Sequence, residues 1–252
     1  MKSLFESMVS RRTALIVGLG AIAAACAGRS PSASLGSPTP SSNATPPAGS
    51  VATPSCIVTP AETEGPYFVD ELLNRSDITT DPSTGTKRGG VPLTLTFQVS
   101  RVGSGGCTAL SGAKVDVWHC DAAGLYSDVS AQSTVGQKFL RGYQLTDADG
   151  MAKFATIYPG WYEGRTVHIH FKVRTYSGTT KSFEISSQLF FDDAVTDSIY
   201  KSVPYSSRPN RDTRNQNDMV YTSNGNSGAK LLVTPTLTGT GNATTFAIGL
   251  NV

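Results

Sequence analysis

The sequence predicts an all-β protein, folded as a two-sheet β-sandwich of about eight strands with one short helix. A hydrophobic fraction of 38%, together with 25 Gly and 14 Pro in 252 residues, is typical of turn-rich β proteins. Beyond residue 91, short segments alternate apolar and polar residues or are rich in β-branched residues, and Gly, Pro, Asn or Asp separate them. Strands of this kind bury their apolar faces by packing one sheet against another.

Turn residues bound the predicted strands. The segment 147–150 (Asp-Ala-Asp-Gly), for example, is a turn between two of them. Only Ala194–Val203 has helical character, opening after Asp192 and closing before Pro204. The predicted strands are Pro92–Val102, Ala113–Cys120, Phe139–Thr146, Ala152–Tyr158, Val167–Tyr176, Phe183–Phe191, Lys230–Leu237 and Thr244–Leu250.

Residues 1–26 are interpreted as an export signal. Arg11 and Arg12 precede the apolar run Ala14–Ala25, which at 12 residues is shorter than the roughly 20 that span a membrane. The region around the two arginines resembles a twin-arginine signal. The run ends at Cys26 and resembles a lipoprotein cleavage site without the usual Leu three places before the cysteine. Lipidation of Cys26 and simple cleavage nearby are both open, and either places the mature protein outside the cytoplasm, extracellular or on the outer face of the cytoplasmic membrane.

Two further boundaries follow from composition. Residues 27–54 are almost entirely Ala, Gly, Ser, Pro and Thr, which bury too little apolar surface to offset the entropy of ordering. We expect a disordered linker there and a single folded domain over residues 55–252.

Charge excludes one class of partner. The 21 basic and 19 acidic residues are interspersed, with no Lys/Arg run longer than a pair. The sequence therefore lacks the basic footprint of a nucleic-acid-binding protein. The only expected membrane contact is the lipid anchor at Cys26, and the oligomeric state is not predicted.

Three cysteines follow Cys26, and an oxidising compartment favours one disulfide among them. Cys56 paired with Cys107 or with Cys120 is preferred to a Cys107–Cys120 bond. A zinc or thiolate site is disfavoured, because the chain has no C-x-x-C pair.

The strongest chemical signal is His168-Ile169-His170 within a predicted strand. Alternate residues of a strand point to one face, so both imidazoles emerge together while Ile169 faces the core. The chain has 3 His in all, and two of them share this strand. A metal site is thus indicated, against the alternative of two ordinary structural histidines.

Two tyrosine-bearing segments stand upstream of this strand. They are Trp118–Tyr126 and the turn-rich Pro159–Arg165, which leads directly to the histidines. Taken singly, each tyrosine is a packing residue by default, and residue-level reasoning alone identifies no further ligand.

The ordered set of these segments resembles the intradiol ring-cleavage dioxygenases, the family of catechol, protocatechuate and hydroxyquinol dioxygenases. The match runs from Thr59–Phe68 through Trp118–Tyr126 and Pro159–Phe171 to Ser187–Phe191. The resemblance implies an enzyme that uses O2 to open a small-molecule catechol between its hydroxylated carbons. It also implies an Fe(3+) cofactor held by Tyr126, Tyr162, His168 and His170.

The resemblance further implies roles beside the metal. Tyr162 would be catalytic, leaving the metal and accepting a substrate proton. Arg165 and Gln188 would bind substrate and stabilise negative charge that develops on it. Tyr67 would lie near the substrate, with buried packing as the alternative.

Three alternatives remain. The chain could be an exported β-sandwich binding module of the same fold without catalysis. It could be a different non-haem iron or copper enzyme on the same scaffold. Asp121 or Asp128 could complete a two-His, one-carboxylate site of the kind that favours Fe(II).

The sequence also departs from the family pattern. His119 stands where better-known relatives carry Gln, and a position just behind the ligands is the preferred interpretation for it. The Tyr162 to His168 spacing is shorter than in many relatives, so the identity of the catechol does not carry over.

Overall fold

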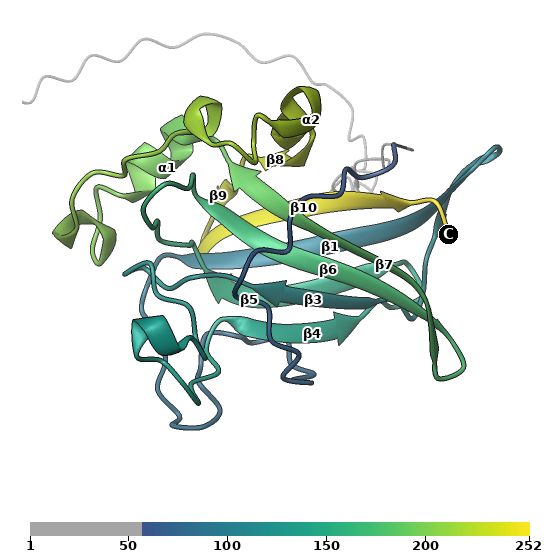
Figure 1. Cartoon of the computed structure of the whole chain (residues 1–252), viewed down its shortest axis with the longest axis horizontal. Coiled ribbons are helices and arrows are strands. Elements are labelled where there is room, and N and C mark those ends of the chain that lie inside the picture. The colour runs from purple at the N-terminus through teal and green to yellow at the C-terminus, as the bar shows by residue number, and fades with distance from the viewer. Residues whose placement is uncertain (1–56) are drawn as a thin grey trace, which may run out of the picture. The chain divides into compact units, whose positions relative to one another are not determined.

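The computed structural model describes residues 57–252, which form two five-stranded sheets packed face to face. Figure 1 shows the layers with the short helices gathered at one end. The predicted two-sheet, all-β architecture is confirmed. The predicted export signal and linker lie outside the described residues. No helix within 57–252 is long and apolar enough to cross a membrane.

The first sheet is organised around its longest strand, β1. The first half of β1 pairs with β5 and its last residues with β2, both antiparallel, while β10 runs parallel along its other edge. β9 extends the sheet beyond β10. The members are β1 (Pro92–Gly103), β2 (Gly106–Ala109), β5 (Met151–Ile157), β9 (Thr236–Thr238) and β10 (Gly241–Leu250).

The second sheet carries the candidate site. Its strands follow the order β4-β3-β6-β7-β8, antiparallel except for the short β8, which pairs parallel with β7. They are β3 (Lys114–Trp118), β4 (Arg141–Leu145), β6 (His168–Ser177), β7 (Thr180–Phe191) and β8 (Leu232–Val233).

The core lies between the sheets and is built by alternate residues of each strand. On β6 the inward residues are Ile169, Phe171 and Val173, all fully buried. They meet the inward side of β1, where Phe97 packs against Phe171 with ring centroids 5.3 Å apart. The period of two therefore sends His168 and His170 to the opposite, outer face of the sheet.

The first described residues cross that outer face. Figure 1 shows this segment running over β6, β3 and β4. Backbone hydrogen bonds fix both ends of the crossing, from Glu62 N to Ser186 O (3.0 Å) and from Tyr143 N to Leu73 O (2.8 Å). Lys172 on β6 pairs with Glu64 of the segment. Because of this cover, β6 is buried on both faces from His168 to Arg174.

The predicted strand Lys230–Leu237 is wrong. A 3-10 turn, Ser227–Leu231, occupies its start, and two separate strands follow. Pro235 stands between β8 and β9 and has no N–H to donate to a ladder. β8 joins the second sheet and β9 the first, so the chain crosses between sheets at this proline.

The helical prediction is close but too long. Helix α1 (Asp193–Ile199) begins where expected, with Asp192 Oδ1 accepting from the backbone N–H groups of Ala194 and Val195. It ends before Val203. The short α2 (Ser223–Asn226) and strand β2 were not predicted, because each is only 4 residues long and lacks a periodic pattern.

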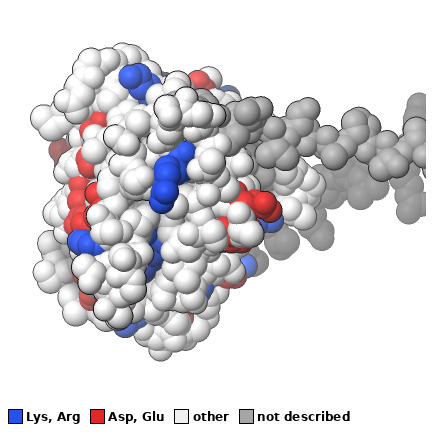
Figure 2. All heavy atoms as spheres, turned by 90° about the vertical axis from the view of Figure 1, so that its right-hand side faces the viewer, with Lys and Arg blue, Asp and Glu red and all other residues white. Residues whose placement is uncertain are grey.

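The structure bears on two expectations from the sequence, the disulfide pairing and the mixed distribution of charge. Cys107 is disulfide-bonded and Cys120 is a free, buried thiol. The predicted alternative Cys56–Cys120 is therefore wrong, and the disfavoured Cys107–Cys120 bond is excluded as well; Cys56 lies outside the described residues. On the face drawn in Figure 2, acidic and basic side chains are interspersed among uncharged ones, which matches the mixed charge of the sequence.

Candidate functional site

The site is built on one row of side chains across the second sheet. His170 on β6 is paired in register with Trp118 on β3 and with Gln188 on β7. His168 lies two residues earlier on the same outer face, and its Nε2 is 3.1 Å from Nε2 of His170. Strand geometry thus brings both imidazoles together, as the sequence predicts.

Two tyrosine hydroxyls meet the histidines at this point. Tyr162, in the loop between β5 and β6, places Oη 3.1 Å from Nε2 of His168. Tyr126, in the long loop after β3, places Oη 3.5 Å from the same nitrogen. Two hydroxyl oxygens and one imidazole nitrogen, from three separate parts of the chain, therefore lie within 3.5 Å of His168 Nε2.

The loop around Tyr126 is held by its own polar side chains. Gln132 accepts a hydrogen bond from Tyr126 N (2.6 Å), and Thr134 Oγ1 donates to Tyr126 O (2.6 Å). Tyr126 is completely buried, whereas Tyr162 is partly exposed. The first hydroxyl is fixed and the second stands nearer to solvent.

His168 is held as a neutral imidazole with one defined tautomer. Its Nδ1 lies 2.6 Å from the carbonyl oxygen of Thr166, which can only accept, so Nδ1 carries the proton. Burial, with the nearby charge of Arg165, lowers the pKa of His168 to about 3. Nε2 therefore presents a lone pair to the site, as a metal-binding imidazole does.

On its Nδ1 side, His170 is oriented by packing rather than by a hydrogen bond. Its ring stacks on Trp118, and the backbone of Gly65 passes so close that an added Cβ would lie 3.1 Å from Cε1. No described residue pairs with its Nδ1. Burial, followed by the charge of His168, lowers the pKa of His170 well below its ordinary value.

Burial has the opposite effect on the tyrosines. It raises the pKa of Tyr162 to about 12 and, with the charge of Tyr162 as the second cause, raises that of Tyr126 well above its ordinary value. Both hydroxyls stay protonated at neutral pH unless a cation is present to stabilise the phenolates.

Arg165 and Gln188 adjoin the four donors. Arg165 Nη2 donates to Gln188 Oε1 (2.5 Å), and Gln188 Nε2 donates to Thr63 O of the crossing segment (2.8 Å). Arg165 Nε donates to the carboxylate of Asp218 (2.8 Å). The structure therefore brings both sequence-predicted residues to the site and joins them to each other.

Tyr67 lies against the tyrosine pair. Its ring centroid is 4.5 Å from that of Tyr126 and 6.2 Å from that of Tyr162. The ring is partly exposed, so both interpretations from sequence, a wall of the site and a packing residue, fit its position.

The carboxylate alternative fails on geometry. Asp121 Oδ1 accepts from the backbone N–H groups of Ala123 and Leu125, and Asp128 accepts from Gly136 N. Over residues 57–252, no three His, Cys, Asp or Glu side chains cluster closely enough to hold a metal ion. The protein oxygens that lie beside His168 Nε2 are the hydroxyls of Tyr162 and Tyr126.

His119 is buried, and both ring nitrogens face protein atoms. Nε2 lies 2.7 Å from Thr156 Oγ1 and Nδ1 lies 2.8 Å from Cys120 O. Burial lowers its pKa to about 4. The ring is therefore neither a spare ligand nor solvent-facing.

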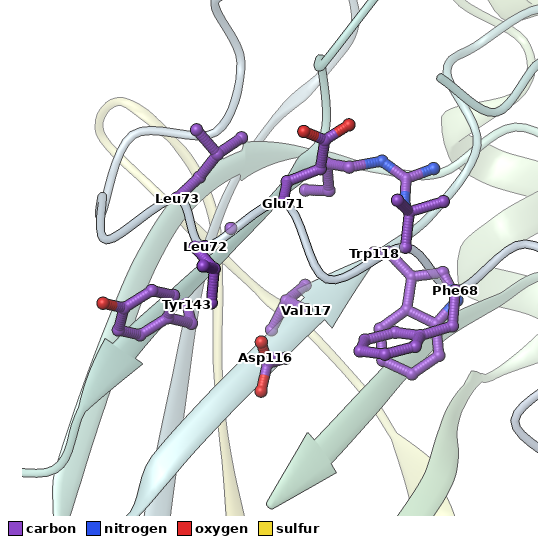
Figure 3. A pocket seen from close by; sticks show the side chains of 11 residues that line it. Phe68, Glu71, Leu72, Leu73, Asp116, Val117, Trp118 and Tyr143 are labelled. Atoms are coloured by element: carbon purple, nitrogen blue, oxygen red, sulfur yellow. The ribbon is translucent and has the colours of Figure 1, made fainter. Parts of the chain in front are cut away.

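A narrow hollow beside the site is closed off from it. Figure 3 shows Phe68, Leu72 and Tyr143 around this hollow, over β3 and β4. Trp118 also lines it and stands between the hollow and His170, because β3 lies between β4 and β6. The stacked ring thus separates the two.

Sequence reasoning missed Thr166, Asp218 and Gly65. Thr166 lies within the matched segment Pro159–Phe171 but acts through its backbone carbonyl, which side-chain patterns do not reveal. Asp218 acts through a carboxylate 52 residues further along the chain and belongs to no segment that the resemblance singled out. Gly65 lies in a segment that the family resemblance covers, but only its closeness to His170 reveals its effect.

Three distances measured from His168 Nε2 have the length expected of donors that share one metal ion. Donors that each lie about 2.0–2.1 Å from a metal are roughly 3.0–3.5 Å apart at ordinary coordination angles. The distances from His168 Nε2 to His170 Nε2, Tyr162 Oη and Tyr126 Oη, of 3.1, 3.1 and 3.5 Å, lie in this range.

Comparison with known proteins identifies similar chains. A family model described as Dioxygenase (Dioxygenase_C) matches residues 63–227. The curated catechol 1,2-dioxygenase 1 of Acinetobacter lwoffii is 29% identical over 161 residues, covering 54% of this chain and 49% of the relative. The chain thus spans about half the length of that relative.

Solved structures are also similar. An intradiol ring-cleavage dioxygenase from Tetranychus urticae superposes with a TM-score of 0.67 at 29% identity, covering 78% of this chain and 95% of the other. The dioxygenase domain of a carbohydrate-binding fusion protein from Streptomyces sp. SirexAA-E gives a TM-score of 0.56 at 30% identity, covering 78% and 99%.

Proposed function

Because this chain belongs to the intradiol ring-cleavage dioxygenase family, we propose that it is an iron(III) enzyme that opens a catechol ring between its two hydroxylated carbons. One observation carries the proposal: the hydroxyls of Tyr126 and Tyr162 and Nε2 of His170 all lie within 3.5 Å of His168 Nε2. The product would be a muconate-type diacid containing both atoms of O2.

The donor set suits ferric iron. Phenolate oxygens are hard, anionic donors, and imidazole is an ordinary ligand of iron. Two phenolates would offset most of the charge of the ion in a buried setting, where uncompensated charge is costly. When bound, iron(III) supplies Lewis acidity that favours ionisation of phenols and makes a bound catecholate reactive towards O2.

The tyrosines take different parts in this proposal. Tyr126 is fully buried and held by Gln132 and Thr134, so it stays in place. Tyr162 is partly exposed and can move aside as substrate enters, and its phenolate can then accept a proton from a catechol hydroxyl. Tyr67 offers an aromatic surface against which a planar ring can pack.

Arg165 and Gln188 supply directed donors beside the metal position. Arg165 is held by Asp218 and Gln188, so its guanidinium is oriented before substrate arrives. A preoriented cation stabilises negative charge that develops on the substrate more effectively than solvent does.

The first test is the visible spectrum of the purified full chain, loaded with iron, before and after anaerobic addition of catechol. We expect a broad tyrosinate band that shifts with substrate, and O2 uptake when air is admitted. Product labelled from ¹⁸O2 should carry both heavy atoms. A Tyr126→Phe/Tyr162→Phe variant should lose the band, whereas Tyr176→Phe, at an exposed tyrosine on the outer end of β6, should keep it.

A colourless protein whose spectrum responds to neither iron nor catechol would contradict the proposed enzyme activity and favour the non-catalytic binding module. The identity of the curated relative and the family match support catechol as the first substrate to try.

We propose further that the enzyme works outside the cytoplasm. The support is the signal-like sequence of residues 1–26. Lipidation of Cys26 and cleavage near it would both leave the mature protein outside the cytoplasm. Mass spectrometry of the mature N-terminus tests this: a retained Met1 and recovery only from cytoplasmic fractions would contradict it, and a lipid on Cys26 would show the anchor.

A further inference from the structure

A buried carboxylate lies behind the site and takes no part in it directly. Asp218 has a fully buried side chain that accepts hydrogen bonds from four donors. Oδ1 accepts from the backbone N–H groups of Val220 and Tyr221, each at 2.8 Å. Oδ2 accepts from Arg165 Nε and Thr166 N, also at 2.8 Å.

The two oxygens therefore have separate tasks. Oδ1 closes the turn in which Asp218 itself lies. Oδ2 reaches across to the loop that leads into β6 and fixes two consecutive residues, one through its side chain and one through its backbone. A carboxylate has about four acceptor positions, and all are used here, which offsets the cost of burying the charge.

Both residues held by Oδ2 act on the site. Arg165 continues through Nη2 to Gln188, and Gln188 to Thr63 on the far side. Thr166 turns its carbonyl to Nδ1 of His168, which selects the tautomer that leaves Nε2 free. One carboxylate thus stands behind both the guanidinium and one imidazole.

We propose that Asp218 is a positioning residue for the reaction, setting the direction of the Arg165 guanidinium and of the Thr166 carbonyl that holds His168. The inference rests on the proposed function. The hydrogen bonds of the Asp218 carboxylate go to Arg165, Thr166, Val220 and Tyr221 and to none of the four donors, so its effect passes through Arg165 and Thr166.

The charge of Asp218 supports this role. Burial raises its pKa, but the hydrogen bond and charge of Arg165, together with the backbone N–H groups of Tyr221 and Thr166, lower it more, so the net pKa is below the ordinary value and the carboxylate stays ionised. An ionised acceptor gives stronger and shorter hydrogen bonds than a neutral one, and it holds an arginine fork in one orientation.

A second side chain supports the same loop. Thr166 Oγ1 donates to Asn215 Oδ1 (2.7 Å), and Asn215 Nδ2 donates to Phe191 O at the end of β7 (2.9 Å). The segment 215–218 therefore ties the loop before β6 to the end of the neighbouring strand.

Asp218→Asn separates the two tasks. The amide oxygen can still accept from Val220 and Tyr221, but the amide nitrogen would face the N–H groups of Arg165 and Thr166, which are also donors. Should that variant fold poorly, Asp218→Ser keeps a hydroxyl acceptor for the turn and removes the atom that faces Arg165. Asp212→Asn is the matched control, because this exposed aspartate contacts the same loop through Gly164 N (3.1 Å) but not Arg165.

The experiment measures kinetics and a signal that does not depend on catalysis. For Asp218→Asn and Asp218→Ser in the full chain, we expect kcat to fall about 10- to 100-fold, the range typical of residues behind metal ligands. KM for catechol should change little, because Arg165 acts on charge that develops during the reaction. In the iron-free full chain, the side-chain Nε–H NMR signal of Arg165, assigned by its loss in Arg165→Lys, should shift and exchange faster.

Three results are decisive. Asp212→Asn should match the wild type in kcat and in the Arg165 signal. If the Asp218 variants retain both wild-type kcat and the wild-type Arg165 signal, the inference is overturned. If the wild type itself cleaves no catechol, the proposed function fails, and the Arg165 signal still shows whether Asp218 orients the guanidinium.

Discussion

The indole of Trp118 lies flat against the imidazole of His170, with ring centroids 5.0 Å apart and ring planes inclined by only 7°. No described side chain hydrogen-bonds to His170 Nδ1, so this stack and the backbone of Gly65 fix the ring plane. The orientation of a candidate ligand therefore depends on packing between two neighbouring strands.

Replacing Trp118 should weaken iron binding beyond its effect on folding. In Trp118→Leu the stack is lost, and we expect iron affinity to fall about 10-fold, as is usual when the support of a ligand is removed. Loss of the buried ring should also lower the free energy of unfolding by about 2–4 kcal/mol. Iron titration followed at the tyrosinate band and urea unfolding of the iron-free chain measure the two effects.

The control is Phe97→Leu, in the core on the inner side of the same sandwich. It should lower the free energy of unfolding while leaving iron affinity unchanged. Equal losses of iron affinity in the two variants would mean that Trp118 acts only through global stability.

Gly65→Ala should disturb His170, and the chain offers a closely matched comparison. Gly65 and Gly85 have the same φ of +71°, which alanine adopts only with strain of about 1 kcal/mol. An added Cβ at Gly65 would lie 3.1 Å from His170 Cε1, whereas at Gly85 it would meet no described atom within 4 Å. Both variants should be destabilised, but only Gly65→Ala should bind iron more weakly. Identical iron titrations would show that the backbone of Gly65 does not confine the ring.

His119 should make folding sensitive to mild acid. Burial lowers the pKa of His119 in the folded chain to about 4, from the ordinary value of 6.5. As the pH falls below 6.5, the unfolded chain therefore binds more protons than the folded chain. Its contribution to stability is complete above pH 6.5 and is lost as the pH falls towards 4, with a slope of up to about 1.4 kcal/mol per pH unit.

His119→Gln removes that titration while keeping a partner for Thr156. Since His168 and His170 also titrate in the iron-free chain, the informative quantity is the difference between the two proteins. Chemical unfolding at several pH values should give a shallower loss for the variant between pH 6.5 and 4. Parallel curves would show that burial does not lower the pKa of His119 in the folded chain.

Arg165→Lys should impair turnover without affecting colour. Lysine keeps the charge but cannot reproduce the pair of directed bonds to Asp218 and Gln188. We expect kcat to fall about 100-fold, which is the lower end of the range seen when a hydrogen-bond donor to charge developing in the transition state is removed. Iron content and the tyrosinate band should be unchanged.

Arg174→Lys is the matched control, since Arg174, on the outer face of β6, is likewise held by acidic partners, Asp70 and Asp116. It should lose stability but keep wild-type turnover. A similar fall in kcat for both variants would mean that any arginine in an ion pair on this face matters equally.

The sequence was most informative where chemistry follows a local repeat. Period-two geometry predicted the shared face of His168 and His170, and alternation predicted most strands of the sandwich. The tyrosines needed the family resemblance, because Tyr126 and Tyr162 reach the histidines only through the folding of two separate loops.

Other features depend on tertiary contacts that no local pattern encodes. Asp218 acts across 53 residues on Arg165, and nothing around it marks a site. The wrong strand at Lys230–Leu237 has a comparable cause: its apolar and β-branched residues are real strand formers, but Pro235 divides them between two sheets.

The alternation along β6 also bears on how this protein could be engineered. Odd-numbered residues from Ile169 to Val173 fill the interior, and even-numbered ones from His168 to Arg174 face the covered outer side. A designer could therefore repack the interior for heat resistance without touching a single side chain of the outer row. Substrate range would be altered by changing the loops and the crossing segment. Heat resistance and substrate range can therefore be improved by separate sets of substitutions, which are then combined in one protein.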